Sequence, residues 1–222
     1  MKGKLEEKTL DVNEIFYSID GEGITSGQLA VFIRLNGCNL RCRYCDTDYA
    51  LKTQKNYISI KDIYNKVKDY KCANITITGG EPLVQENTLY LIEYLTKKGY
   101  RVNIETNGAI DIKSLSKIKN TIITLDIKTP DSKMDRYNNF NNFEYLRDTD
   151  VLKIVVGSLN DLDYAYKIVE KYNPDCQVFL SPIFGEIKGA DIVEYMKNKK
   201  NDKIKFQLQI HKYIWDPLKK GV

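Results

Sequence analysis

The amino-acid sequence predicts an α/β fold in which a parallel sheet stays open, as a partial TIM-like barrel with outer helices. Short β-branched runs alternate with amphipathic helical segments along the chain, which is typical of parallel sheets covered by helices. The pattern predicts about six parallel strands after the cysteine loop begins, too few to close an eight-stranded barrel. No internal repeat or linker divides the 222 residues, so one domain spanning residues 1–222 is expected.

The predicted strands are short runs of β-branched and other apolar residues. The first run leads into a cysteine-containing loop, and the others follow that loop, several of them ending at glycine or polar residues. The runs cover residues 30–35, 74–78, 101–105, 121–127, 151–156, 177–180 and 205–208.

The predicted helices repeat apolar residues with a helical period. They cover residues 59–70, 83–98, 162–172 and 191–199. Ser59 and Asn160 are expected to cap the first and third of them, and Gly99 ends the second. The polar, asparagine-rich segment 135–142 is expected to be an exposed loop.

The composition excludes several classes of protein. A net charge of +4, spread over many lysines, does not indicate a nucleic-acid-binding surface. No run approaches the ~20 apolar residues of a membrane helix. Five cysteines, an odd number, and no apolar leader predict a reducing, cytoplasmic location, where clustered thiols favour metal or redox chemistry over disulfides.

Cys38, Cys42 and Cys45 form the most informative motif, with the spacing C-x3-C-x2-C. A structural zinc site or an ordinary four-iron cluster takes four protein ligands. Three local thiols therefore leave one metal position open for chemistry. The alternatives are three buried thiols or a zinc site completed from afar. The distant candidates for that fourth ligand are His211, Cys72 and Cys176, of which the two cysteines are otherwise interpreted as small buried hydrophobic residues.

Further polar motifs fall at the ends of the predicted strands. The carboxyl ends of parallel strands are where ligands bind in α/β sheets, so we expect these motifs to converge on one site. They are Arg34 and the cysteines, Gly79-Gly80-Glu81-Pro82, Glu105-Thr106-Asn107-Gly108, Asp126 with Lys128, and Ser181-Pro182.

Several candidate site residues, at these strand ends and elsewhere, also have a simpler structural explanation. Asp126 and Lys128 share one strand face, either as a mutual ion pair or as ligand-binding groups. Glu22 lies between two glycines in what is either a solvated turn or a loop that directs its carboxylate. Thr47 is either a helix cap or an oxygen ligand for Mg²⁺. His211, the single histidine, is either a packed core residue or a proton carrier.

Together these motifs resemble one family of the radical S-adenosylmethionine (SAM) superfamily, the 7-carboxy-7-deazaguanine synthases. The matching segments are Gly21-Glu22-Gly23, Phe32-Ile33-Arg34, the cysteine loop with Cys45-Asp46-Thr47, Thr78-Gly79-Gly80-Glu81-Pro82, Glu105-Thr106-Asn107-Gly108 and Gln209-Ile210-His211-Lys212. Two positions depart from the family pattern: Asp20 replaces the usual glutamine, and Asp126-Ile127 replaces the usual Ser-Pro.

The resemblance implies a radical ring contraction. A [4Fe-4S] cluster reduces SAM to methionine and a 5′-deoxyadenosyl radical, which takes a hydrogen from 6-carboxy-5,6,7,8-tetrahydropterin. The ring contracts with loss of ammonia to give 7-carboxy-7-deazaguanine, a precursor of the tRNA nucleosides queuosine and archaeosine, and SAM is regenerated. The resemblance also implies Mg²⁺, a flavodoxin or ferredoxin as electron donor, and a homodimer.

The residue roles implied by the resemblance follow from matching positions. Cys38, Cys42 and Cys45 hold the cluster and Thr47 binds Mg²⁺. The SAM site comprises Tyr44, Cys45, Asp46, Gly80, Asp126, Ile127, Lys128 and Ser181. The pterin site comprises Ile19, Asp20, Gly21, Glu22, Arg34, Thr78 and the C-terminal Val222, with His211 as a possible catalytic residue.

Two competing hypotheses remain at this level. A glycyl-radical activating enzyme shares the cysteine spacing and the Gly-Gly-Glu element, but acts on a large protein and does not need Arg34, Glu22 and Thr47 around a small acid. A non-catalytic iron-sulfur or zinc protein requires a fourth protein ligand and leaves the convergence of the other motifs without a reason.

Overall fold

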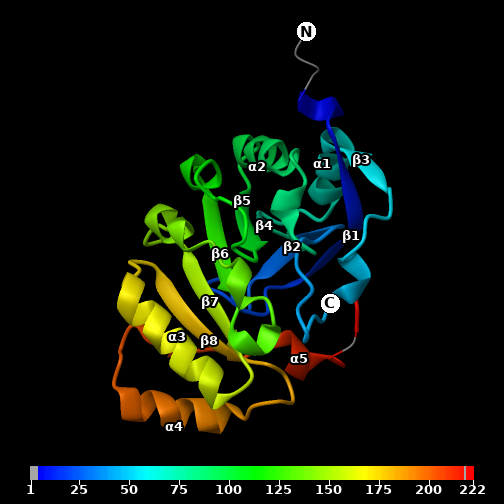
Figure 1. The fold of residues 1–222 in the computed structure, drawn as a ribbon. Helices are drawn as coiled ribbons and strands as arrows, with labels where there is room; N and C mark the ends of the chain where they lie inside the picture. The colour runs from blue at the N-terminus through cyan, green and yellow to red at the C-terminus, as the bar shows by residue number, and fades with distance from the viewer. Residues whose placement is uncertain (1–4, 218) are drawn as a thin grey trace.

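The structure, a computed structural model, describes residues 5–217 and 219–222, which contain one nine-stranded open sheet (Figure 1). In sheet order its strands are β3 (Tyr57–Ser59), β1 (Thr9–Ile19), β2 (Leu29–Leu35), β4 (Asn74–Gly79), β5 (Arg101–Thr106), β6 (Thr121–Ile127), β7 (Val151–Val156), β8 (Gln177–Pro182) and β9 (Ile204–Phe206). Neighbouring strands from β2 to β9 are parallel, whereas β1 is antiparallel to both β2 and β3. The predicted open parallel sheet is confirmed, and its seven parallel strands are the one before the cysteine loop and six after it.

The sequence pattern did not predict β1 and β3. Polar residues that point into the interior interrupt the apolar pattern of β1. Asp11, for example, is only 3% exposed, and its carboxylate accepts hydrogen bonds from the backbone amides of Gln54, Lys55 and Asn56. These bonds hold the chain that follows the cysteine loop, so a residue that looks like a loop residue in the sequence has a structural role here.

The helices pack against the sheet, α1 and α2 nearest β1 and β5, and α3 and α4 nearest β7 and β9 (Figure 1). Their bounds are α1 (Ile60–Asp69), α2 (Thr88–Lys97), α3 (Leu159–Tyr172), α4 (Gly189–Lys199) and a short α5 (His211–Ile214). Ser59 caps α1 as predicted. α2 begins later than predicted because Pro82–Val84 forms a separate 3-10 turn. The predicted Asn160 cap of α3 is wrong, since Ser158 accepts the hydrogen bond from the amide of Asp161.

The segment predicted as an exposed loop contains two 3-10 turns, Asp135–Tyr137 and Phe140–Tyr145. Its residue Asn142 is fully buried, in contrast to the prediction. The Asn142 side chain donates to the carbonyls of Gly108 and Ile110 and accepts from the amide of Ile112. A buried asparagine can replace regular backbone pairing in this way, which composition alone does not reveal.

The core lies between the sheet and its helices and consists mainly of valine, isoleucine and leucine. None of the helices in the described residues is long and apolar enough to cross a bilayer. Because the buried side chains fill the sheet–helix layer, the polar residues at the carboxyl ends of the parallel strands face a separate hollow on the sheet.

Candidate active site

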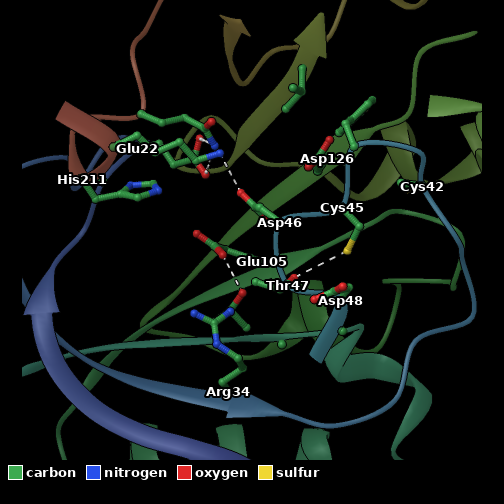
Figure 2. A pocket seen from close by; sticks show the side chains of 18 of the residues that line it. Glu22, Arg34, Cys42, Cys45, Asp46, Thr47, Asp48, Glu105, Asp126 and His211 are labelled. Carbon is green, nitrogen blue, oxygen red and sulfur yellow. Dashed lines mark hydrogen bonds and ion pairs between the residues drawn. The ribbon is translucent and has the colours of Figure 1, made fainter. Parts of the chain in front are cut away.

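A cavity of about 440 Å³ opens at the carboxyl ends of the parallel strands (Figure 2). It brings together most residues of the predicted site, although they come from distant parts of the chain. The predicted residues that line it are Ile19, Gly21, Glu22, Arg34, Cys38, Cys42, Tyr44, Cys45, Asp46, Thr47, Thr78, Gly80, Asp126, Lys128, His211 and Val222.

Three residues predicted to bind ligands do not line this cavity. Ile127 is fully buried in the core, because alternation along β6 directs Asp126 and Lys128 to one face and Ile127 to the other. Ser181 is also fully buried, and its hydroxyl has no hydrogen-bond partner among the described residues. The carboxylate of Asp20 accepts a hydrogen bond from the hydroxyl of Thr76 at 2.7 Å instead of facing the cavity.

The cysteine loop is held in place by backbone hydrogen bonds at its base. The amide of Gly37 donates to the carbonyl of Ala50 at 2.8 Å, and the amide of Glu81 donates to the carbonyl of Gly37 at 2.8 Å. A Cβ at Gly80 would lie 2.3 Å from the carbonyl oxygen of Gly37, and one at Gly79 would lie 2.1 Å from that of Leu35. The two glycines therefore permit close packing of the cysteine loop on the end of β4.

The donor set fits a cluster with three protein thiolates. Burial raises the pKa of the Cys38 and Cys42 thiols, so ligation requires their deprotonation. Among the described residues no group of three or more cysteine, histidine or acidic side chains is arranged to hold a metal ion as it stands. The buried Tyr44 hydroxyl and one carboxylate oxygen of Asp126 have no hydrogen-bond partner within the described chain, as expected for groups that face a ligand.

A buried charge cluster occupies the floor of the cavity. Glu22 forms an ion pair with Lys153 and lies 3.3 Å from the side-chain amide of Gln209. Lys153 also lies 4.0 Å from Asp126, whose nearer partner is Lys128 at 3.0 Å. Burial lowers the pKa of Lys153, but its neighbours Glu22 and Asp126 outweigh burial and raise it. Lys153 therefore stays charged in the interior.

Lys153 and Gln209 were not predicted as site residues. Lys153 interrupts the apolar run of β7 (Val151–Val156), and its strand neighbour in register is Asp126. A lone lysine within a buried strand is a usable signal, because an unpaired charge there is costly. Gln209 lies in the segment 209–212 that resembles the family, but it is 187 positions from Glu22, so the sequence does not indicate their contact.

Glu105 is the carboxyl whose pKa is most informative. Burial, reinforced by the charge of Glu22, raises the pKa of Glu105 to about 7, although Lys153 and a hydrogen bond from Thr78 at 2.7 Å oppose this. The side chain lines the cavity. It can therefore exist in either protonation state near neutral pH, as a hydrogen-bond donor or as an acceptor.

Arg34 and Lys212, two cationic residues of the cavity, are each paired with a carboxylate. Arg34 binds Glu14 at 2.7 Å and lies over the ring of Tyr49. Lys212 binds Asp46 at 2.7 Å and joins α5 to the cysteine loop. Burial raises the pKa of Asp46, but the opposing effects, of which the Lys212 charge is the largest, together outweigh burial, so the pKa of Asp46 lies below its ordinary value.

Thr47 and His211 both line this cavity; in Figure 2 Thr47 lies beside Asp48 and His211 lies beside Glu22. Thr47 stands at the start of a 3-10 turn, Asp48–Ala50, but its side chain makes no capping hydrogen bond, which weakens the capping hypothesis. Its hydroxyl lies 3.8 Å from the sulfur of Cys45. His211 packs closely on Gly21, and burial lowers the His211 pKa. A neutral imidazole at the cavity wall can accept or donate a hydrogen bond.

Comparisons with known proteins agree with this architecture. The radical SAM superfamily model matches residues 32–156. The 7-carboxy-7-deazaguanine synthase of Clostridium acetobutylicum is 43% identical over 217 residues, which cover 95% of this chain and 98% of the relative. The enzyme of the same name from Chlorobaculum tepidum is 34% identical, over 97% of this chain and 99% of the relative.

A solved structure shows the same fold. The crystal structure of QueE from Escherichia coli superposes with a TM-score of 0.74 at 22% identity, covering 94% of this chain and 98% of the other. The superfamily match and the similarity to named synthases over nearly the whole chain show that this chain belongs to the 7-carboxy-7-deazaguanine synthase family of the radical SAM superfamily.

Proposed function

We propose that this chain converts 6-carboxy-5,6,7,8-tetrahydropterin into 7-carboxy-7-deazaguanine with loss of ammonia. The observation that carries the proposal is the convergence of three cysteines, Arg34, and the Glu22–Lys153 pair on one cavity. The similarity to synthases of that name over 95% of the chain supports the same activity. The deazapurine product would serve the biosynthesis of queuosine-type nucleosides, and hence tRNA modification.

Membership of the superfamily implies a [4Fe-4S] cluster held by Cys38, Cys42 and Cys45, together with SAM. When bound, these cofactors supply the radical that takes a hydrogen atom from the substrate. Tyr44, Asp46, Gly80, Asp126 and Lys128 line the adjoining wall and would hold SAM, whereas Ser181 and Ile127 are buried and do not line the cavity. The protein's contribution is to orient the two ligands and exclude water.

Arg34 is suited to the substrate carboxylate because its planar guanidinium can donate two parallel hydrogen bonds. The Glu14 carboxylate that pairs with it at 2.7 Å keeps the group oriented before substrate binds. Glu22, held by Lys153, presents a fixed acceptor to the amino-pyrimidinone ring. Thr78 and the C-terminal Val222 line the same space and complete the proposed pterin site.

Mg²⁺ would bind at Thr47, next to Asp46 and Asp48 on the cavity wall. Oxygen donors of this kind suit the cation, which also accepts oxygens from its substrate. The bound ion would fix the orientation of the ring during its rearrangement.

The partners and location follow from the chemistry. One-electron reduction of the cluster requires an external carrier such as a flavodoxin or ferredoxin. Cysteines that must hold a cluster as thiolates are suited to the reducing cytoplasm, and the five cysteines of the chain form no disulfide. We further propose that the active form is a homodimer.

Anaerobic reconstitution tests the function. Iron-loaded protein, given reductant, SAM, Mg²⁺ and 6-carboxytetrahydropterin, should form the deazapurine, detected by mass spectrometry, while consuming little SAM. Turnover with a glycyl-radical enzyme but none with the pterin would overturn the proposal. Spectra of a metal centre with four protein ligands would instead favour the non-catalytic alternative.

A further inference from the structure

Asn107, at the carboxyl end of β5, touches the cysteine loop. Its side-chain nitrogen lies 3.8 Å from the sulfur of Cys38 and donates to the side-chain oxygen of Asn39 at 2.9 Å. Its side-chain oxygen accepts from the amide of Ala109 at 3.0 Å. An amide nitrogen carries two hydrogens, so one serves Asn39 and the other points to the sulfur.

The backbone of Asn107 is fixed by a buried carboxylate. The amide of Asn107 donates to Glu81 at 2.6 Å, and Glu81 is fully buried. Glu81 also accepts from the amide of Leu83 at 3.0 Å and the hydroxyl of Thr106 at 2.8 Å. The side chain of Asn107 is itself only slightly exposed, so its amide is oriented before any cluster is present.

Cys38 receives a second donor from its own loop. The amide of Leu40 donates to the Cys38 sulfur at 3.4 Å. Donors aimed at a ligating sulfur withdraw negative charge from an iron-sulfur cluster, and this effect is larger in the reduced state, which carries one more electron. Two donors on one thiolate therefore favour reduction.

We propose that Asn107 hydrogen-bonds the Cys38 thiolate and raises the reduction potential of the cluster. The inference rests on the proposed function, because it requires a [4Fe-4S] cluster on the three cysteines. In the step concerned, one electron passes from the external one-electron carrier to the cluster. Asn107 neither gains nor loses a proton or an electron; it positions an N–H group that stabilises the added charge. Asn107 is thus a positioning residue for the reduction of the cluster.

The test is a set of three substitutions at Asn107. Asn107→Asp keeps the acceptor for Ala109 but replaces the donor with a carboxylate oxygen. Asn107→Leu removes the donor without adding charge, and Asn107→Gln retains an amide. Midpoint potentials are measured on anaerobically reconstituted protein by redox titration followed by electron paramagnetic resonance, without substrate.

We expect the potential to fall in the order wild type, Gln, Leu, Asp. At a fixed ambient potential, Asn107→Leu should decrease the ratio of reduced to oxidised cluster at least about threefold, which is a shift of about 30 mV for a one-electron couple. The resonance of the reduced cluster should change with it. If Asn107→Asp takes up too little iron to titrate, the leucine and glutamine variants decide.

Asn103→Asp is the matched control. Asn103 is a buried asparagine on the same strand, and its side-chain oxygen accepts from the Thr124 hydroxyl at 3.0 Å, which aspartate preserves. Its potential should remain close to that of the wild type. Unchanged potentials and resonances in the Asn107 variants would refute the inference, whereas a wild-type protein that assembles no [4Fe-4S] cluster would refute the proposed function itself.

Discussion

Replacement of Lys153 by methionine should strongly destabilise the protein. The Lys153 ammonium pairs with Glu22, lies 4.0 Å from Asp126, and both it and Glu22 have side chains only 10% exposed. Methionine has a similar length but no charge, so Glu22 would be left buried without its cation. Removing one partner of a buried ion pair costs about 3–5 kcal/mol.

The pH dependence of this effect follows from the raised pKa of Lys153. A lysine whose pKa is higher in the folded state stabilises fully below its unfolded pKa, and the contribution disappears as pH rises through the folded value. Near pH 7 the whole effect is therefore present. Above about pH 10.5, the ordinary pKa of lysine, the difference between wild type and variant should shrink.

Urea unfolding at pH 7 measures the loss. If unfolding a chain of this size has an m-value of about 3 kcal/mol/M, a loss of 3–5 kcal/mol lowers the midpoint by about 1–1.7 M. Lys97→Met, which breaks an exposed pair with Glu93 on α2, should change the free energy of unfolding by less than about 1 kcal/mol. A Glu22→Gln, Lys153→Met double variant should be more stable than the sum of the single losses predicts. Midpoints within about 0.2 M of each other for wild type and Lys153→Met, or strict additivity, would refute the reasoning.

Three other substitutions test the remaining assignments. Thr47→Ala should reduce the stimulation of product formation by Mg²⁺ while the iron content, measured by absorbance, stays at the wild-type level; an unaltered Mg²⁺ titration would remove Thr47 from the metal site. Arg34→Lys should weaken carboxypterin binding about 10- to 100-fold, as seen in KM or direct titration, because a single ammonium cannot reproduce two hydrogen bonds to a carboxylate. Asp20→Asn should increase stability relative to wild type as pH rises, because burial, although opposed by hydrogen bonds from Thr76 and Thr25, raises the pKa of Asp20. A carboxyl with a raised pKa stabilises below its unfolded pKa and loses that contribution as pH rises through the folded value; urea midpoints for Asp20→Asn and wild type that differ equally at pH 4 and pH 8 would contradict this.

The departure at Asp20 is explained by its position. A glutamine at a pterin-contacting position would donate and accept hydrogen bonds, but the Asp20 carboxylate turns from the cavity to Thr76. The backbone amide of Asp20 donates to the carbonyl of Gln28 at 2.8 Å, and that of Gly27 donates to the carbonyl of Asp20 at 2.8 Å. The side chain and backbone of Asp20 thus close the loop that carries Glu22.

The amino-acid sequence alone determined the class of fold and predicted the chemistry of the site. Alternating apolar periods specify strands and helices locally, and the spacing of Cys38, Cys42 and Cys45 predicts a three-thiolate site, because both depend on residues close together in the chain. The strand-end rule then placed Arg34 and Lys128 in one cavity, which the structure contains.

Only the tertiary structure decided which groups satisfy one another. The pairing of Lys153 with Glu22, and the contact of Asn107 with Cys38, join residues separated by 131 and 69 positions. It likewise decided that Asp20 faces Thr76 and that Asn142 is buried. Burial and long-range pairing depend on which strands and loops become neighbours in the folded sheet, and these come from distant parts of the chain.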